Sequence, residues 1–175
     1  MAESTQEQIN YFYRGCAARG TIINHTIDLE LGLEEYIAHH ICANDEKRLD
    51  TLQMLLSTEK VTFGSKTDTF IQILKKKSAS KKEFEKEFPA ITSDLQNIAK
   101  IRNRFAHDIM PTDKPEGEPN DPGDYEICLR RGSTNELTFY TNDGIKELID
   151  KIDKYKIVLF YVLIKEINGK PLISR

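Results

Sequence analysis

The chain has 175 residues, of which 39% are hydrophobic and 30% are charged, and its formal net charge is −3. This composition predicts one soluble globular domain with a substantial hydrophobic core, and it excludes a wholly disordered chain. A net charge this close to zero also argues against a general nucleic-acid coat protein, although it leaves room for a small basic site.

Three further features bear on location. The longest uninterrupted apolar run, Ile157–Ile164, is far shorter than the roughly 20 residues that a membrane-spanning helix needs. The first residues are polar and acidic and show neither a signal peptide nor an Arg-rich presequence. The cysteines, Cys16, Cys42 and Cys128, are odd in number and widely spaced, so they predict no disulfide framework. We therefore expect a cytoplasmic protein that makes no membrane contact.

Apolar residues recur every three or four positions in the first half of the chain, which predicts helices. The first is a long helix over residues 20–43, whose inward face would hold Ile22, Ile23, Thr26, Leu33, Ile37 and Ile41. Asp45 is expected to cap a second helix that carries Leu49, Leu52, Leu55 and Leu56. Residues 57–66 are interpreted as a turn and residues 67–77 as a third helix, with Phe70, Ile71 and Leu74 facing inward.

The second half of the chain shows a different succession of elements. Residues 75–82 are basic and predict a solvated connector, followed by a helix from Pro89 or Ile91 to His107 with a Ser93–Gln96 capping box. The proline-rich, acidic segment 110–124 is expected to be an irregular surface loop. Segments 125–130 and 136–140 predict a β-hairpin, and Thr141 or Asn142 is expected to cap the final helix. The inward face of that helix would hold Ile145, Leu148, Ile152, Tyr155, Leu159 and Val162.

These elements predict an all-α fold, an antiparallel helical bundle with a small β-hairpin before the last long helix. We expect a single domain over residues 1–175, with a bundle core at about residues 20–165, the irregular loop at 110–124 and the hairpin at 125–140.

The segment Ile101–His107 carries the most chemical information. Arg102 falls inside the apolar stripe of its helix, which consists of Ile91, Leu95, Ile98, Ile101 and Phe105. Glu30 likewise falls on the apolar face of the first long helix. Because an unpaired buried charge is very costly, we predict that Glu30 and Arg102 form an ion pair inside the bundle, either direct or through one water.

Asn103 and His107 are four residues apart and share the neighbouring polar face, with Lys100 beside them. A second cluster, His39, His40 and Cys42, is interpreted as polar residues at a helix end, because a metal site there would need ligands from elsewhere. The sequence shows no phosphate-binding glycine loop, no paired-cysteine zinc pattern and no nucleophile elbow. We predict neither a metal nor a cofactor.

The Arg102-Asn103-Arg104-Phe105-Ala106-His107 segment resembles the Arg…His signature of the HEPN superfamily of helical bundles. The Phe63-Gly64-Ser65-Lys66 turn that opens a helix, and a central Glu on the preceding long helix (here Glu30), resemble its mannitol operon repressor-like branch. The resemblance covers roughly residues 20–165, but only the six-residue motif is distinctive.

For many HEPN proteins the motif belongs to a metal-independent endoribonuclease in which two protomers share one cleft. The resemblance implies that His107 helps to remove the ribose 2′-OH proton, that Arg102 stabilises phosphoryl charge, and that Asn103 orients His107 or the phosphate. Arg104, on the solvent side of the helix, and Lys100 would contact the RNA backbone, and Glu30 would support the site structurally.

The same geometry predicts a homodimer that pairs near the Arg102–His107 helix end, because Arg102 and His107 project in different directions from one helix. RNA and an inhibitory or regulatory partner protein are further expected partners. The alternative is a non-catalytic regulatory or protein-interaction module, as in mannitol repressor-like proteins, whose Arg-Asn-His motif ties helices together.

Overall fold

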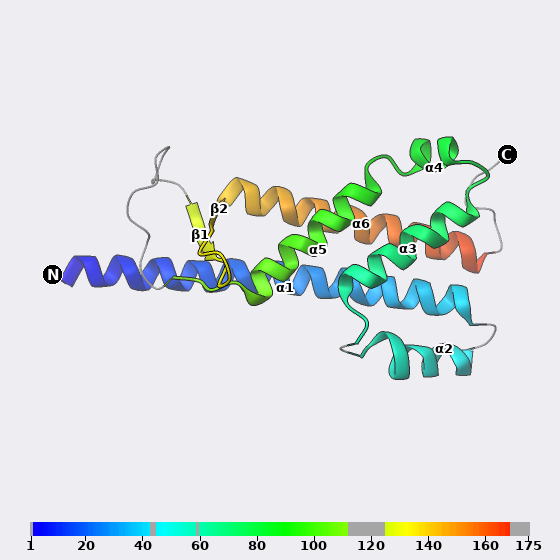
Figure 1. Cartoon of the computed structure of the whole chain (residues 1–175), viewed down its shortest axis with the longest axis horizontal. Helices are drawn as coiled ribbons and strands as arrows, with labels where there is room; N and C mark the ends of the chain where they lie inside the picture. The colour runs from blue at the N-terminus through cyan, green and yellow to red at the C-terminus, as the bar shows by residue number, and fades with distance from the viewer. Residues whose placement is uncertain (1, 43–44, 59, 112–124, 169–175) are drawn as a thin grey trace. The chain divides into compact units, whose positions relative to one another are not determined.

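The computed structural model describes residues 2–42, 45–58, 60–111 and 125–168. These residues form a mostly helical bundle with a two-stranded antiparallel hairpin before the long final helix (Figure 1). The prediction of a helical bundle with a small hairpin before the last long helix is therefore confirmed. None of the helices in these ranges is long and apolar enough to cross a membrane.

The elements follow one another along the chain as six α-helices, one π-helix and two strands within the described ranges. They are α1 (Ala2–Ile41), α2 (Asp45–Thr51), the π-helix η1 (Leu52–Leu56), α3 (Phe63–Lys77), α4 (Lys81–Glu87), α5 (Ile91–His107), β1 (Tyr125–Arg130), β2 (Leu137–Thr141) and α6 (Asn142–Ile167).

The chain divides into two compact units, which are described separately. Unit 1 takes residues 1–26 and 101–150, and unit 2 takes residues 27–100 and 151–175. The long helices α1, α5 and α6 each contribute residues to both units.

The core of unit 1 forms where α1 meets the hairpin. The buried Tyr11 hydroxyl accepts a hydrogen bond of 3.2 Å from the backbone N–H of Cys128, and Leu137 and Phe139 pack against this pair. Gly15 of α1 allows Met110 to pack closely against this helix, because a Cβ at position 15 would come within 2.6 Å of Met110 Sδ. The hairpin is antiparallel and pairs Cys128 with Phe139.

In the core of unit 2, the helices pack closely against one another. A Cβ on Gly32 of α1 would lie 2.4 Å from Leu159 Cδ2 of α6, so glycine allows these helices to approach closely. Tyr36 of α1 and Phe70 of α3 meet edge to face, with ring centroids 5.1 Å apart.

The sequence located two of the helices correctly. The helix α5 covers Ile91–His107 as expected, and all six predicted inward residues of α6 are buried. Thr141 caps α6, since its Oγ1 accepts a hydrogen bond of 3.1 Å from Gly144 N. The hairpin is confirmed with its second strand shifted by one residue. Most of the predicted irregular loop, residues 112–124, lies outside the described residues.

Several predicted boundaries are wrong. The helix α1 begins at Ala2 rather than at residue 20, because no proline interrupts residues 2–19 even though their apolar pattern is sparse. Ile41 is 60% exposed and does not face the core. The helix α3 begins at Phe63, because Thr62 Oγ1 accepts a hydrogen bond from Ser65 N and caps it.

The basic segment after α3 also differs from the prediction. Residues 75–77 continue α3, and α4 follows over Lys81–Glu87, capped by Ser80. Phe84 and Phe88 are buried, and the many lysines around them concealed this apolar pair in the sequence. The Ser93–Gln96 capping box is absent, since Ser93 Oγ donates to Ala90 O and Gln96 Nε2 donates to Asp68 Oδ1.

Replacing Ala90 with glycine is expected to stabilise the fold. Ala90 precedes α5 with a φ of 61°, the left-handed conformation that costs a residue with a Cβ about 1–2 kcal/mol. Glycine relieves this cost but adds entropy to the unfolded chain, which leaves a net gain of about 0.5–1 kcal/mol in the free energy of unfolding. Urea denaturation measures the change. The matched control, Ala99→Gly in the middle of α5, should instead lose about 1 kcal/mol, and a loss with Ala90→Gly would contradict the expectation.

Candidate functional site

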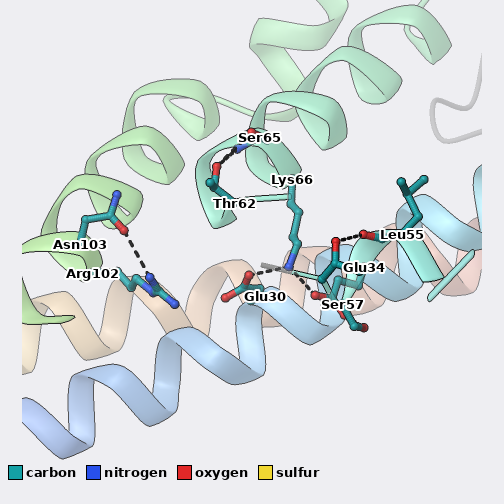
Figure 2. Close-up of polar contacts among 10 residues, drawn as sticks. Glu30, Glu34, Leu55, Ser57, Thr62, Ser65, Lys66, Arg102 and Asn103 are labelled. Carbon is teal, nitrogen blue, oxygen red and sulfur yellow. Dashed lines mark hydrogen bonds and ion pairs between the residues drawn. The ribbon is translucent and has the colours of Figure 1, made fainter. Parts of the chain in front are cut away.

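The motif lies at the C-terminal end of α5, in unit 1. Phe105 fixes this end, because its side chain is fully buried and its ring centroid lies 4.7 Å from that of Tyr140. Arg102 is half-buried, while Asn103 and His107 are exposed. Arg102 Nη1 donates a hydrogen bond of 3.3 Å to Asn103 Oδ1 (Figure 2). The helix therefore presents a guanidinium bound to an amide, with an imidazole one turn further along.

A second arginine, absent from the sequence-based prediction, binds this helix end. Arg19 of α1 donates from Nη2 to Ala106 O at 2.9 Å and from Nη1 to Asp108 O at 3.2 Å. Carbonyls in the last turn of a helix have no partner within the helix, so Arg19 satisfies two acceptors on either side of His107. Nothing around Arg19 in the sequence marks this role, because the contact spans 87 residues.

Arg104 does not occupy the solvent-facing position that was predicted. Its side chain is 19% exposed and lies between Asp108 Oδ2, at 3.5 Å from Nε, and Glu136 Oε1, at 3.3 Å from Nη2. Two carboxylates therefore compete with any phosphate for this guanidinium. Lys100, the other residue predicted to contact RNA, is exposed.

Glu30 belongs to a buried ionic triad in unit 2. Lys66 Nζ lies 2.6 Å from Glu30 Oε1 and 2.5 Å from Glu34 Oε1, and Ser57 Oγ donates to Glu34 Oε2 (Figure 2). Lys66 is only 3% exposed. The sequence marked Glu30 as a misplaced charge but did not identify Lys66 as its partner. Because Glu30 and Arg102 belong to different units, the ion pair predicted between them stays a prediction.

Two other carboxylates are held by polar clusters in unit 2. Asp94 Oδ2 accepts a hydrogen bond of 2.6 Å from the Tyr155 hydroxyl, and Asp94 Oδ1 lies 3.3 Å from Lys151 Nζ. Burial opposes ionisation of Asp94, but these partners outweigh it and lower its pKa. The same contact, together with burial as the larger cause, raises the pKa of Tyr155.

Glu166 of α6 occupies the second cluster. Its Oε1 forms an ion pair with Lys77 Nζ and lies 3.1 Å from His40 Nδ1. Burial alone would raise the pKa of Glu166, but Lys77 and then His40 and Tyr36 lower it below its ordinary value. Burial, with the nearby charge of Glu166, raises the pKa of Tyr36.

The depressed pKa values of Asp94 and Glu166 predict acid sensitivity. A carboxyl whose pKa is lowered in the fold stabilises it fully above the unfolded value of about 4, and this contribution is lost as pH falls through the lower folded value. We therefore expect the free energy of unfolding to decrease below about pH 4. Urea denaturation at several pH values measures it, and the Asp94→Asn/Glu166→Gln double variant should show a flatter profile. An identical profile in the variant would contradict this assignment.

The predicted helix-end cluster around His40 shows no metal geometry. Cys42 Sγ lies 3.1 Å from Thr51 Oγ1 and donates to Lys47 O, while His40 contacts Glu166. Within the described ranges, no group of three or more His, Cys, Asp or Glu side chains is arranged to hold a metal ion.

The structure also contains an open pocket of about 550 Å³ in unit 2, away from the motif's own residues. Its floor includes Phe84, Phe88 and Ile91, and Lys75 and Lys81 lie among its polar residues. No residue of the Arg102–His107 segment lines it, so the pocket adds nothing to the motif's chemistry.

Comparisons with protein-family models, with curated proteins and with solved structures found no match for this chain. The HEPN resemblance therefore rests on the Arg102–His107 segment, the Phe63–Lys66 turn and Glu30.

Proposed function

We propose that the chain is a HEPN-like, metal-independent endoribonuclease whose chemistry is carried by Arg102, Asn103 and His107. The observation that carries the proposal is the exposure of Asn103 and His107 beside Arg102, which is already bound to the Asn103 amide. A motif with only a structural role would be expected to bury its imidazole and satisfy it with fixed partners.

The proposed reaction uses the RNA, this motif and, for the last proton transfer, water or a second imidazole. His107 accepts the proton of a ribose 2′-OH, and the 2′-oxygen attacks the adjacent phosphorus. Arg102 donates hydrogen bonds to the phosphoryl oxygens as negative charge develops on them. Asn103 holds the guanidinium of Arg102 in position through its side-chain amide. The bond from phosphorus to the 5′-oxygen breaks, and that oxygen takes a proton from a second imidazole or from water. The products are a 2′,3′-cyclic phosphate and a 5′-hydroxyl.

Incubation with defined RNAs in EDTA tests this proposal. Cleavage should proceed without metal, leave cyclic phosphate ends, and stop at any position where the nucleotide upstream of the cleaved bond is 2′-deoxy. An RNA left intact across varied sequences and structures would refute the proposal, and cleavage abolished by EDTA would refute its mechanism.

A non-catalytic regulatory or interaction module is the second candidate. The contacts of Arg19 with the carbonyls of Ala106 and Asp108, and of Arg104 with Asp108 and Glu136, favour it, because these arginines hold the end of α5 in place. Under this candidate Arg102→Ala would lower the free energy of unfolding, while the wild-type protein would leave RNA intact.

A further inference from the structure

The C-terminal half of α6 is apolar on two opposite sides. One side is buried in unit 2 and includes Ile152, Tyr155, Leu159 and Val162. The other side is exposed and repeats at three- and four-residue spacing, which places its members on one face. They are Ile157 (70% exposed), Phe160 (65%), Tyr161 (48%), Ile164 (40%) and Ile167 (59%).

The helix α1 extends this face within unit 2. Lys156 Nζ lies 3.2 Å from Asp28 Oδ2, and Leu159 packs against Gly32, so the two helices run side by side in the same direction. In a parallel pair of right-handed helices, the residue before Gly32 and the residue after Leu159 point to the same side. Leu31 (56% exposed) therefore joins Phe160, and Ile27 (41%) lies one turn before Leu31. We call these seven exposed side chains the α1–α6 apolar face.

The face is larger than an ordinary surface patch. Seven large side chains, each about half exposed, present roughly 700 Å² of mainly apolar surface, above the largest patch of a typical monomer. A standard protein interface buries about 800 Å² per partner, so this face has the size of one side of an interface.

The segments outside the described residues contain few large hydrophobic side chains. Residues 112–124 contain no large hydrophobic residue, and residues 169–175 contain two, Leu172 and Ile173. The flanking lysines carry little unbalanced charge, because Lys156 pairs with Asp28 and Asp153, and Lys165 lies 3.9 Å from Glu87. The face therefore combines the size of one side of a protein interface with little unbalanced charge at its edges.

The order of residues along α6 supports a second copy of this chain as the occupant of the face. The run Ile157-Val-Leu-Phe-Tyr-Val-Leu-Ile164 has the same chemical character when read in either direction, with Phe160 and Tyr161 at its centre. Across a two-fold axis through this centre, antiparallel α6 helices would place Phe160 against the partner's Tyr161 and Ile157 against the partner's Ile164. We propose that the α1–α6 apolar face is the surface through which two copies of this chain pair.

Sedimentation equilibrium of the full chain at micromolar concentration tests the proposal. The wild type should be a dimer, and Phe160→Glu should weaken association by at least about 100-fold, because it buries an unpaired charge at the centre of the interface. Tyr13→Glu is the matched control, since Tyr13 is a 68% exposed aromatic residue outside the face, and it should leave the dimer intact. Circular dichroism confirms that both variants fold.

Cross-linking checks the register, with exposed Cys16 replaced by serine. A mixture of Ile157→Cys and Ile164→Cys chains should form an oxidised dimer more readily than either variant alone. A monomeric wild type, or a dimer unaffected by Phe160→Glu, would overturn the proposal. So would a monomer that binds phosphatidylcholine vesicles through this face.

The proposal does not rest on ribonuclease activity, because no step of its test measures RNA cleavage. It also differs from the pairing predicted at the end of α5. A dimer that is lost in His107→Ala and retained in Phe160→Glu would favour the α5 end and overturn the α1–α6 apolar face.

Discussion

Replacing Lys66 with methionine is expected to cost about 3–5 kcal/mol of the free energy of unfolding. Lys66 is 3% exposed and is the shared partner of Glu30 and Glu34, which lie one turn apart on α1. Without the ammonium, two carboxylates with little access to water would lose the cation that they share. Methionine keeps most of the side-chain volume, so urea denaturation reports mainly the loss of charge.

Two comparisons separate this effect from general disruption. Lys60→Met, at an exposed position, should change the free energy of unfolding by less than about 0.5 kcal/mol. Adding Glu34→Gln to Lys66→Met should recover part of the loss, because one of the two carboxylate charges disappears. Glu30→Ala should likewise destabilise far more than Glu116→Ala, a change in the acidic segment 110–124 that the sequence predicts to be a surface loop. A cost below about 1 kcal/mol for Lys66→Met would mean that water reaches the triad.

The elements that the sequence predicted well have strong periodicity and clear ends. The helix α6 combines a regular apolar face with the Thr141 cap, and α5 ends where the pattern stops at His107. The hairpin was predicted because β-branched and aromatic residues flank a polar turn that contains glycine. In these segments local preference and tertiary packing agree, so the local pattern was sufficient.

The elements that the sequence missed depend on contacts with distant residues. Residues 2–19 have a weak helical pattern, and Tyr11 is ordered by a hydrogen bond to Cys128 in the hairpin. The helix α4 is short and highly charged, and Phe84 and the capping residue Phe88 are buried by tertiary packing rather than marked by a strong helical pattern. The local sequence does not indicate which distant residues a segment will contact, so these elements could not be predicted from it.

The candidate site was likewise predicted only in part from the sequence. The residues of the motif were predicted from one helix, and their exposure agrees with the hydrophilic face assigned to Asn103 and His107. The partners of the motif were not predicted, because Arg19 is far away in the sequence and because Arg104 meets Glu136 of the segment that joins the two strands. For Glu30 the sequence identified the unusual charge correctly, but it did not indicate Lys66, whose contact with Glu30 spans 36 residues.

Replacing His107 with alanine is expected to lower RNA cleavage by about 100-fold or more, which is the usual contribution of a general acid or base. Its side chain is exposed, so the free energy of unfolding should change by less than about 0.5 kcal/mol. Arg102→Ala should lower cleavage as well, but with a loss of stability, because Arg102 is half-buried and bound to Asn103.

The matched control is His39→Ala, a half-buried histidine of unit 2 that lies outside the motif. It should cleave RNA at the wild-type rate, provided that circular dichroism shows a native fold. The rate is measured by quantifying cyclic phosphate ends under single-turnover conditions in EDTA, which excludes contaminating metal-dependent nucleases. Equal cleavage by His107→Ala and wild type would remove the imidazole from the mechanism, since no other motif residue can take the 2′-OH proton near neutral pH. The exposed end of α5 would then be explained by a binding role alone.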